Sequence, residues 1–220
     1  MPLTSGPISV SLAIQYGTDF AYQATLGSLA GTIAQAAFCF TYCLLAKKGW
    51  SLALIVSTLI FAITAVFLES TNLKQSGMFA LAILLIVLVL WKMPIDGKKV
   101  TTLGPPWWDL PLRMALIVML ILGVTLIAPF VGPTLSGAIA SFPFIATIMA
   151  VFGHRAVGHA AAQQTFHGMV TGLFGFATFF YALGIMLGKV SLPIAYLAAS
   201  LFCITVQGIV LIFQRHRFNR

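Results

Sequence analysis

Acidic residues are scarce in this 220-residue chain, which has four Asp and Glu side chains against twelve Lys and Arg. Charged residues make up 7% of the sequence and hydrophobic residues 60%, whereas soluble domains carry about 25% charged residues. So few polar side chains cannot cover a water-exposed surface, and so apolar a chain does not stay disordered in water. The composition excludes both classes and indicates an integral membrane protein.

Cysteine is also rare, and familiar catalytic motifs are missing. Cys39, Cys43 and Cys203 lie inside apolar segments, which is typical of small buried residues and not of disulfides or metal ligands. The sequence has no nucleophile elbow, phosphate-binding loop, zinc-ligand set or paired carboxylates. We therefore expect no enzyme, no metal and no cofactor. The net charge of +8 comes from scattered basic residues, which indicate membrane topology and not nucleic-acid binding.

Long apolar runs follow one another along the chain. A membrane-spanning helix needs about 20 apolar residues, and helices satisfy their own backbone hydrogen bonds in lipid. The first run is the weakest, because Gly17 and Asp19 interrupt it. The sequence predicts an all-α membrane bundle of eight transmembrane helices, at residues 3–22, 26–46, 50–68, 77–91, 107–130, 133–152, 162–187 and 190–213.

The basic residues support this topology. With the N-terminus inside, Lys74 and Lys189 would face outward and the other ten basic residues would face the cytoplasm. This is a strong positive-inside bias, whereas a seven-span chain would reverse half of the molecule. We expect a protein of the bacterial inner membrane, surrounded by lipids, with both termini cytoplasmic. The ten residues are Lys47, Lys48, Lys92, Lys98, Lys99, Arg113, Arg155, Arg215, Arg217 and Arg220.

A short internal repeat divides the chain into two halves. Residues 29–38 align with residues 135–144, sharing Leu, Gly, Ile, Ala and Phe at the same offsets. We predict a four-plus-four parallel repeat, related by an axis along the membrane normal, with chance similarity between apolar helices as the alternative. The predicted parts are a first repeat at 1–93, a cytoplasmic connector at 94–106, a second repeat at 107–214 and a basic tail at 215–220.

The second half also carries a family resemblance. Its motifs are Leu135-Ser136-Gly137, Phe142-Pro143, Gly153-His154-Arg155 and Leu192-Pro193. With these motifs, residues 109–213 resemble the GlpM family of small four-span inner-membrane proteins. The first half resembles that family only through its Leu-x-Gly-x-Ile-Ala pattern, and it lacks the proline, having Ala37 there. The resemblance implies a four-helix membrane unit. The internal repeat predicts that this chain contains that unit twice.

Polar residues within apolar spans are candidates for function because they are costly in lipid. Asp19 could exchange protons against a cationic or hydroxylated solute. Gln35 and its repeat counterpart Ser141 are expected between the repeats near mid-membrane. Pro143 should break the sixth helix there. The spacing of Gly27 and Gly31 predicts a face for close helix packing. For each candidate a structural role is the alternative. The predicted substrate-binding residues are Asp19, Gln35, Arg113, Ser141, Gln164 and His167.

Geometry and chemistry refine these candidates. We expect Asp19, Gln35 and His167 to approach one shared polar cavity. Arg113 lies one helical turn after Asp109, and it either anchors the helix at the membrane interface or binds an anionic substrate. Gln164 and His167 stand at the inner mouth of the seventh span, where the imidazole could relay protons.

Two functions fit this sequence. The first is a small secondary transporter for a small polar or amphiphilic solute, with proton coupling through Asp19. The second is a non-transporting accessory or scaffold subunit of an envelope or polysaccharide-export complex, which the GlpM resemblance favours. A homodimer or a partner within such a complex is compatible with either function.

Overall fold

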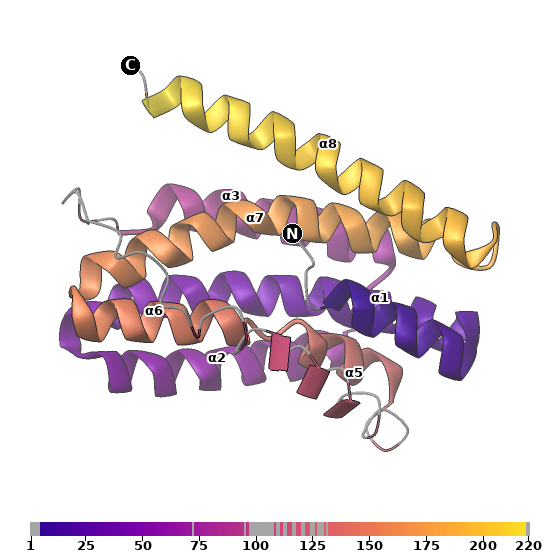
Figure 1. Ribbon diagram of the computed structural model, residues 1–220, viewed down its shortest axis with the longest axis horizontal. Helices are drawn as coiled ribbons and strands as arrows, with labels where there is room; N and C mark the ends of the chain where they lie inside the picture. Colours follow the sequence, from indigo (N-terminus) through magenta and orange to yellow (C-terminus); the bar gives the residue numbers. More distant parts are fainter. Residues whose placement is uncertain are drawn as a thin grey trace.

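The computed structural model describes residues 5–71, 73–94, 96 and 132–218, and ten single positions between 108 and 130. The side chains of residue 5 and of 213–218 are outside this description. The described residues form helices and no strand (Figure 1). The elements are α1 (Ser5–Leu45), η1 (Ala46–Lys48), α2 (Trp50–Ser70), α3 (Gln75–Lys92), α5 (Pro133–Ala140), α6 (Phe144–Ala156), α7 (His159–Met186) and α8 (Leu192–Phe218).

Six segments of the described chain are long and apolar enough to cross a membrane. They are α1, α2, α3, α5 together with α6, α7 and α8. The all-helical prediction is thus confirmed, and the apolar helices fit an integral membrane protein. The predicted total of eight spans is not reproduced among these residues. The predicted fifth span at 107–130 lies largely outside them, although nine of its described positions, from Pro111 to Phe130, are helical.

The first predicted span is wrong as a separate crossing. α1 continues through residues 23–25, where the boundary between the first two spans was expected, and is interrupted instead at Gly17, with φ 87° and ψ 173°. L-residues with a side chain rarely adopt this conformation. The preceding twelve residues, 5–16, reach only about 18 Å as a helix, too short for a bilayer core of about 30 Å.

The segment before Gly17, which we call the N-terminal arm (residues 5–16), folds back onto the bundle. Its Ile8 and Leu12 form a small buried cluster with Ala24 of α1 and Ala140 of α5. Ile8 and Ala24 would lie about 24 Å apart in one straight helix, so their presence in one small cluster requires the reversal at Gly17. The indigo start of α1 accordingly lies beside α5 in Figure 1.

The helix directions follow from residues that meet at the two ends of the bundle. At one end, Gly184 of α7 lies against the Thr25 hydroxyl and the Gln75 amide. At the other end, Gln163 of α7 donates a hydrogen bond to the Cys43 carbonyl. α1 therefore runs antiparallel to α7. The α5–α6 segment runs parallel to α1, because Gly27 meets Thr134 at its start and Tyr42 meets His154 at its end.

The described basic side chains gather at one end of this bundle. We call it the basic end: α1, α3 and α6 finish there, and it carries Lys47, Lys48, Lys92 and Arg155. The opposite end, which we call the far end, carries Lys74 and Lys189 in the loops before α3 and α8. This distribution is the one that the positive-inside pattern predicts. α8 continues to Phe218 and so includes most of the predicted tail.

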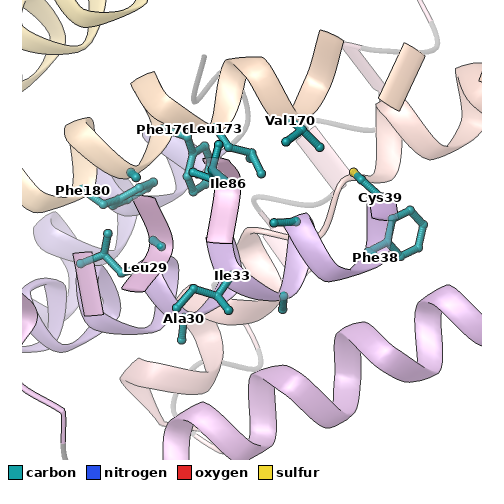
Figure 2. Close-up of a cluster of buried hydrophobic side chains, with 14 of the residues drawn as sticks. Leu29, Ala30, Ile33, Phe38, Cys39, Ile86, Val170, Leu173, Phe176 and Phe180 are labelled. Atoms are coloured by element: carbon teal, nitrogen blue, oxygen red, sulfur yellow. The ribbon is translucent and has the colours of Figure 1, made fainter. Parts of the chain in front are cut away.

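The core is built from α1, α2, α3, α7 and α8. Figure 2 shows Leu29, Ile33 and Cys39 of α1 with Ile86 of α3 and side chains of α7, all of them buried. α1 is the central helix, since it packs against α2, α3, α5 and α7. α8 lies across the bundle and packs mainly on α7 (Figure 1). Apolar side chains of α2 and α8 remain exposed, including Ile63 and Leu197, as expected for surfaces in contact with lipid.

Buried glutamines tie the helices together. Gln75 donates to the Tyr181 carbonyl at 2.9 Å, and Gln207 of α8 accepts from the Gly175 amide of α7 at 3.3 Å. Gln35 and Gln163 bind main-chain carbonyls of other helices in the same way. Because lipid gives little hydrophobic drive for helices to associate, such polar contacts and close packing hold membrane bundles together.

Candidate functional site

The first feature of interest is the crossing of α1 with α5. Gly27 and Gly31 of α1 and Gly137 of α5 lie where the two backbones touch. A Cβ added to Gly27 would overlap the Thr134 carbonyl, and one added to Gly137 would overlap the Ala24 carbonyl. Small residues in membrane helices allow this approach, and the spacing of Gly27 and Gly31 predicted such a face. The crossing is closed and tightly packed.

Directly after this crossing, the helix is interrupted. α5 ends at Ala140 and α6 begins at Phe144, with Ser141, Phe142 and Pro143 between them. Pro143 has no amide hydrogen and cannot continue the helical hydrogen-bond pattern, so the predicted break in this helix is confirmed. The Phe142 carbonyl accepts instead from the Phe144 amide at 2.9 Å. We call residues 141–143 the interruption.

Gln35 of α1 is held against this interruption. Its Nε2 donates to the Ser141 carbonyl, while Ser141 Oγ donates to the Gly137 carbonyl at 2.8 Å. The Gln35 Oε1 and, in the first turns of α6, the Thr147 Oγ1 are buried without a hydrogen-bond partner in the described part of the chain. A buried polar atom left unpaired costs about 1–3 kcal/mol. These two atoms are therefore candidates for binding the donors of a ligand.

Aromatic rings surround the interruption. The Phe142 ring lies 5.6 Å from Phe38 of α1, 5.0 Å from Phe61 of α2 and 4.5 Å from Phe144. Two of these contacts are edge-to-face across helices, a favoured arrangement for aromatic pairs. Phe142 thereby couples the interruption to both α1 and α2.

Among the predicted site residues that the structure describes, a hydrogen bond joins Gln35 to Ser141. Asp19 is exposed at the far end, and sixteen residues of α1 place it about 24 Å along the helix from Gln35. Because of that separation, Asp19 and Gln35 do not share a small cavity. His167 is half-buried and Gln164 exposed on α7. Arg113 lies outside the described residues.

A second polar group, which the sequence did not lead us to select, lies at the basic end. The Tyr42 hydroxyl is 3.2 Å from His154 Nδ1, and His159 Nε2 is 2.7 Å from Asp96 Oδ2. Gln163 joins these contacts by accepting from the Asp96 amide and donating to the Cys43 carbonyl, both at 3.2 Å. We call Tyr42, Asp96, His154, His159 and Gln163 the basic-end network.

The network joins segments that are distant in sequence. Tyr42 ends α1, Asp96 follows α3, His154 ends α6 and His159 begins α7. Arg155 lies over the Trp50 ring at 5.5 Å, which adds the start of α2 to the same end. In the sequence His154 and His159 look like loop residues and Asp96 like part of a connector. The only signal for the network was the closeness of two histidines in one loop, and no nearby carboxylate accompanied them.

The basic-end network contains two imidazoles and one carboxylate, which are side chains that can bind protons. Among the described residues, no group of three or more His, Cys, Asp or Glu side chains could hold a metal ion. An imidazole bound to a carboxylate can take up a proton as an ion pair. His159 and Asp96 each keep 34% of their side-chain surface exposed, so water can reach the pair.

No protein-family model, curated protein or solved structure matches this chain. The resemblance of residues 109–213 to the GlpM family therefore rests on the sequence motifs alone and stays a prediction.

Proposed function

We propose that this protein is a small secondary transporter for a small polar solute. The observation that carries the proposal is the interruption of the α5–α6 span beside Gln35, whose buried Oε1 has no partner among the described residues. Transporters commonly form their sites where a helix is discontinuous and its main-chain groups are available to a ligand. Buried polar groups in a membrane span are costly, which favours a functional reason for keeping them.

The solute would bind at the interruption by hydrogen bonds. Gln35 Oε1 accepts an N–H or O–H of the solute, and the Thr147 hydroxyl can donate or accept. These two side chains are neutral, so they favour a solute that is itself neutral or zwitterionic. Gln35 Nε2 remains bound to the Ser141 carbonyl, which orients the amide with Oε1 as the free acceptor.

Movement would occur around the interruption. The glycine crossing of α1 and α5 is tight and serves as the fixed part of the carrier. α6 is separated from α5 by three residues without continuous helical bonding and is the part that moves. Opening α6 away from α1 exposes Gln35 to one face of the membrane, and its return closes that route.

We also propose that the two halves descend from a duplication. Gly49 and Gly158, which precede α2 and α7, have φ values of 121° and 113°. α1 and α5 also run in parallel, as a parallel repeat requires. We place the basic end at the cytoplasmic face of a bacterial inner membrane.

The test compares two glutamines in the purified protein. Thermal stability in detergent is measured against a panel of single neutral and zwitterionic amino acids, sugars and polyols. Any compound that stabilises the wild type is then followed as radiolabelled counterflow in proteoliposomes. Gln35→Leu should abolish both the stabilisation and the counterflow. Gln207→Leu, which removes a buried amide from the α7–α8 contact, should keep both.

Two outcomes would contradict this proposal. One is a solute that stabilises and exchanges equally well in Gln35→Leu. The other is wild-type protein that moves no solute of the panel but purifies with a stoichiometric envelope protein, which would favour the accessory-subunit function instead.

A further inference from the structure

The basic-end network ties the two halves of the chain to each other. The Tyr42–His154 contact joins α1 to α6, and the Asp96–His159 contact joins the segment after α3 to α7. Each pair therefore has one member before residue 97 and one after residue 132. α6, which the proposed transport movement displaces, carries His154 at its last turn. Any opening at this end must loosen one or both pairs.

The geometry of the Asp96–His159 pair fixes where a proton can bind. His159 Nε2 lies 2.7 Å from Asp96 Oδ2. With Asp96 ionised, its carboxylate only accepts hydrogen bonds, so the hydrogen of this contact is on Nε2. Nδ1 is then the ring nitrogen that takes an added proton, converting the imidazole to an imidazolium. The pair changes from a net charge of −1 to zero, and a hydrogen bond becomes an ion pair.

We propose that the Asp96–His159 pair is the proton-binding site that couples transport to the proton gradient. This inference rests on the proposed function and identifies the coupling ion and its site. A proton taken from the aqueous phase binds His159 Nδ1 and leaves from the same atom, so no other reactant is needed. Protonation strengthens the tie between the two halves at the basic end, and deprotonation weakens it.

Other titratable and charged groups lie at the same end of the bundle as this pair. His154 interacts electrostatically with His159, and its partner Tyr42 lies on α1. The cationic groups at the same end are Arg155 on α6, Lys92 on α3 and Lys47 and Lys48 on η1. Asp96 is the sole described carboxylate of this end, because Asp19 and Glu69 lie towards the far end. Among these cations, the Asp96 carboxylate stabilises the positive charge of a protonated His159.

This assignment replaces Asp19 as the proton-carrying carboxylate. Asp19 is exposed near the start of the long part of α1, whereas Asp96 is bound both through its side chain to His159 and through its amide to Gln163. A coupling group must respond to conformational change, and His159 lies only three residues after the end of α6 at Ala156, so movement of α6 is passed to the Asp96–His159 pair. The two aspartates therefore form a matched pair for the experiment.

The first experiment uses proteoliposomes with the solute identified by the stability panel. Uptake driven by an imposed pH gradient is compared with counterflow, which needs no net proton movement. Asp96→Asn and His159→Gln should each reduce gradient-driven accumulation by about tenfold or more, a typical size for energetic coupling between sites, with counterflow retained. Asp19→Asn should keep both activities. The inference would be overturned if Asp96→Asn accumulated solute as strongly as the wild type, or if Asp19→Asn lost gradient-driven accumulation.

The second experiment needs no solute and so separates this inference from the proposed function. Spin labels on cysteines placed at Lys92 and Val157, both exposed, report the distance between the end of α3 and the α6–α7 loop, with Cys39, Cys43 and Cys203 replaced by alanine. The distance distribution should be narrow at pH 5.5 and broaden at pH 8.5. The same broadening should be present at both pH values in Asp96→Asn. A distribution that responds equally to pH in wild type and Asp96→Asn would show that this pair binds no relevant proton, whether or not transport is found.

Discussion

The α1–α5 crossing and the basic-end network hold the same two parts of the molecule together by opposite means. At the crossing, main chains touch through Gly27, Gly31 and Gly137, and the contact depends on the absence of side chains. At the basic end, the same α1 and the following α6 are joined through side chains, Tyr42 and His154, at 3.2 Å.

The difference indicates how the contacts would behave when the molecule moves. Contact between helical backbones is short-ranged and has one good geometry, so it resists movement. A hydrogen bond between side chains can be broken and remade, and its strength depends on protonation. The crossing thus suits a fixed point, and the network suits a contact that opens. The predictions below test this division, beginning with the largest expected effect.

The fixed point should tolerate no additional atoms. We expect Gly137→Ala to lower the free energy of unfolding by about 3 kcal/mol, because its methyl group would overlap the Ala24 carbonyl and the helices would have to separate. The measurement is unfolding in mixed detergent micelles followed by circular dichroism.

Gly168→Ala in α7 is the matched control, since a methyl group there meets nothing within 4 Å. It should raise stability by up to about 1 kcal/mol through better helix propensity. Equal effects of the two substitutions would mean that the α1–α5 crossing is not close-packed.

The two glutamines Gln163 and Gln35 should respond differently to replacement by leucine. Gln163 uses both ends of its amide, so Gln163→Leu should cost about 2 kcal/mol by leaving two partners unpaired. Within the described part of the chain, Gln35 makes one hydrogen bond through Nε2, and its buried Oε1 has no partner. Gln35→Leu should change stability by less than about 0.5 kcal/mol, because the lost hydrogen bond and the removal of the unpaired Oε1 nearly cancel.

This comparison sharpens the assignment of Gln35. A residue kept for packing costs stability when it is replaced, whereas a residue kept for ligand binding costs activity. If unfolding of Gln35→Leu in the same micelles shows a loss as large as that of Gln163→Leu, the free Oε1 is not a binding group.

The Tyr42–His154 contact should contribute a smaller amount. In a double-mutant cycle of Tyr42→Phe and His154→Phe, we expect a coupling energy of about 1 kcal/mol, the usual net value of one hydrogen bond. Phenylalanine at both positions retains the edge-to-face packing of the rings and removes only the polar contact. A coupling energy of zero would mean that the two side chains act independently and do not tie α1 to α6.

The Arg155–Trp50 contact should have the smallest effect. Because Trp50 is partly exposed, with 38% of its surface accessible, Trp50→Leu should lower stability by only about 0.5 kcal/mol. Trp91→Leu serves as the control, since Trp91 is paired with Lys92 of its own helix and ties no two helices together. If Trp50→Leu lowered stability by more than the coupling energy of the Tyr42–His154 cycle, the Arg155–Trp50 contact would be the main contact between α2 and α6.

The sequence predicted well where the physical cause is local. α2 and α3 match their predicted spans within two residues at either end, because each is an apolar run between polar residues. The break at Pro143 and the Gly27–Gly31 packing face were also predicted, since a missing amide hydrogen and missing side chains act at their own positions. Gly17 was recognised as an interruption, but its positive φ and the reversal that follows were not.

Prediction failed where a residue's role depends on its distance from others. Asp19, Gln35 and His167 were grouped because each is polar in an apolar run, although Asp19 lies about 24 Å along α1 from Gln35. Asp96 and His159 were overlooked because they are 63 residues apart, with no pattern connecting them. Composition identifies which residues are unusual but does not say which of them meet.

The helical class, the apolar spans and the clustering of basic residues at one end could all be read from the chain before any fold was known. They follow from the free-energy cost of placing unpaired main chain and charge in lipid, which applies to each residue separately. The return of the N-terminal arm, the meeting of Gln35 with the interruption and the meeting of Asp96 with His159 became apparent only in the folded molecule. Those contacts depend on how whole helices pack, which is a sum over many small surfaces and is not encoded in any one segment.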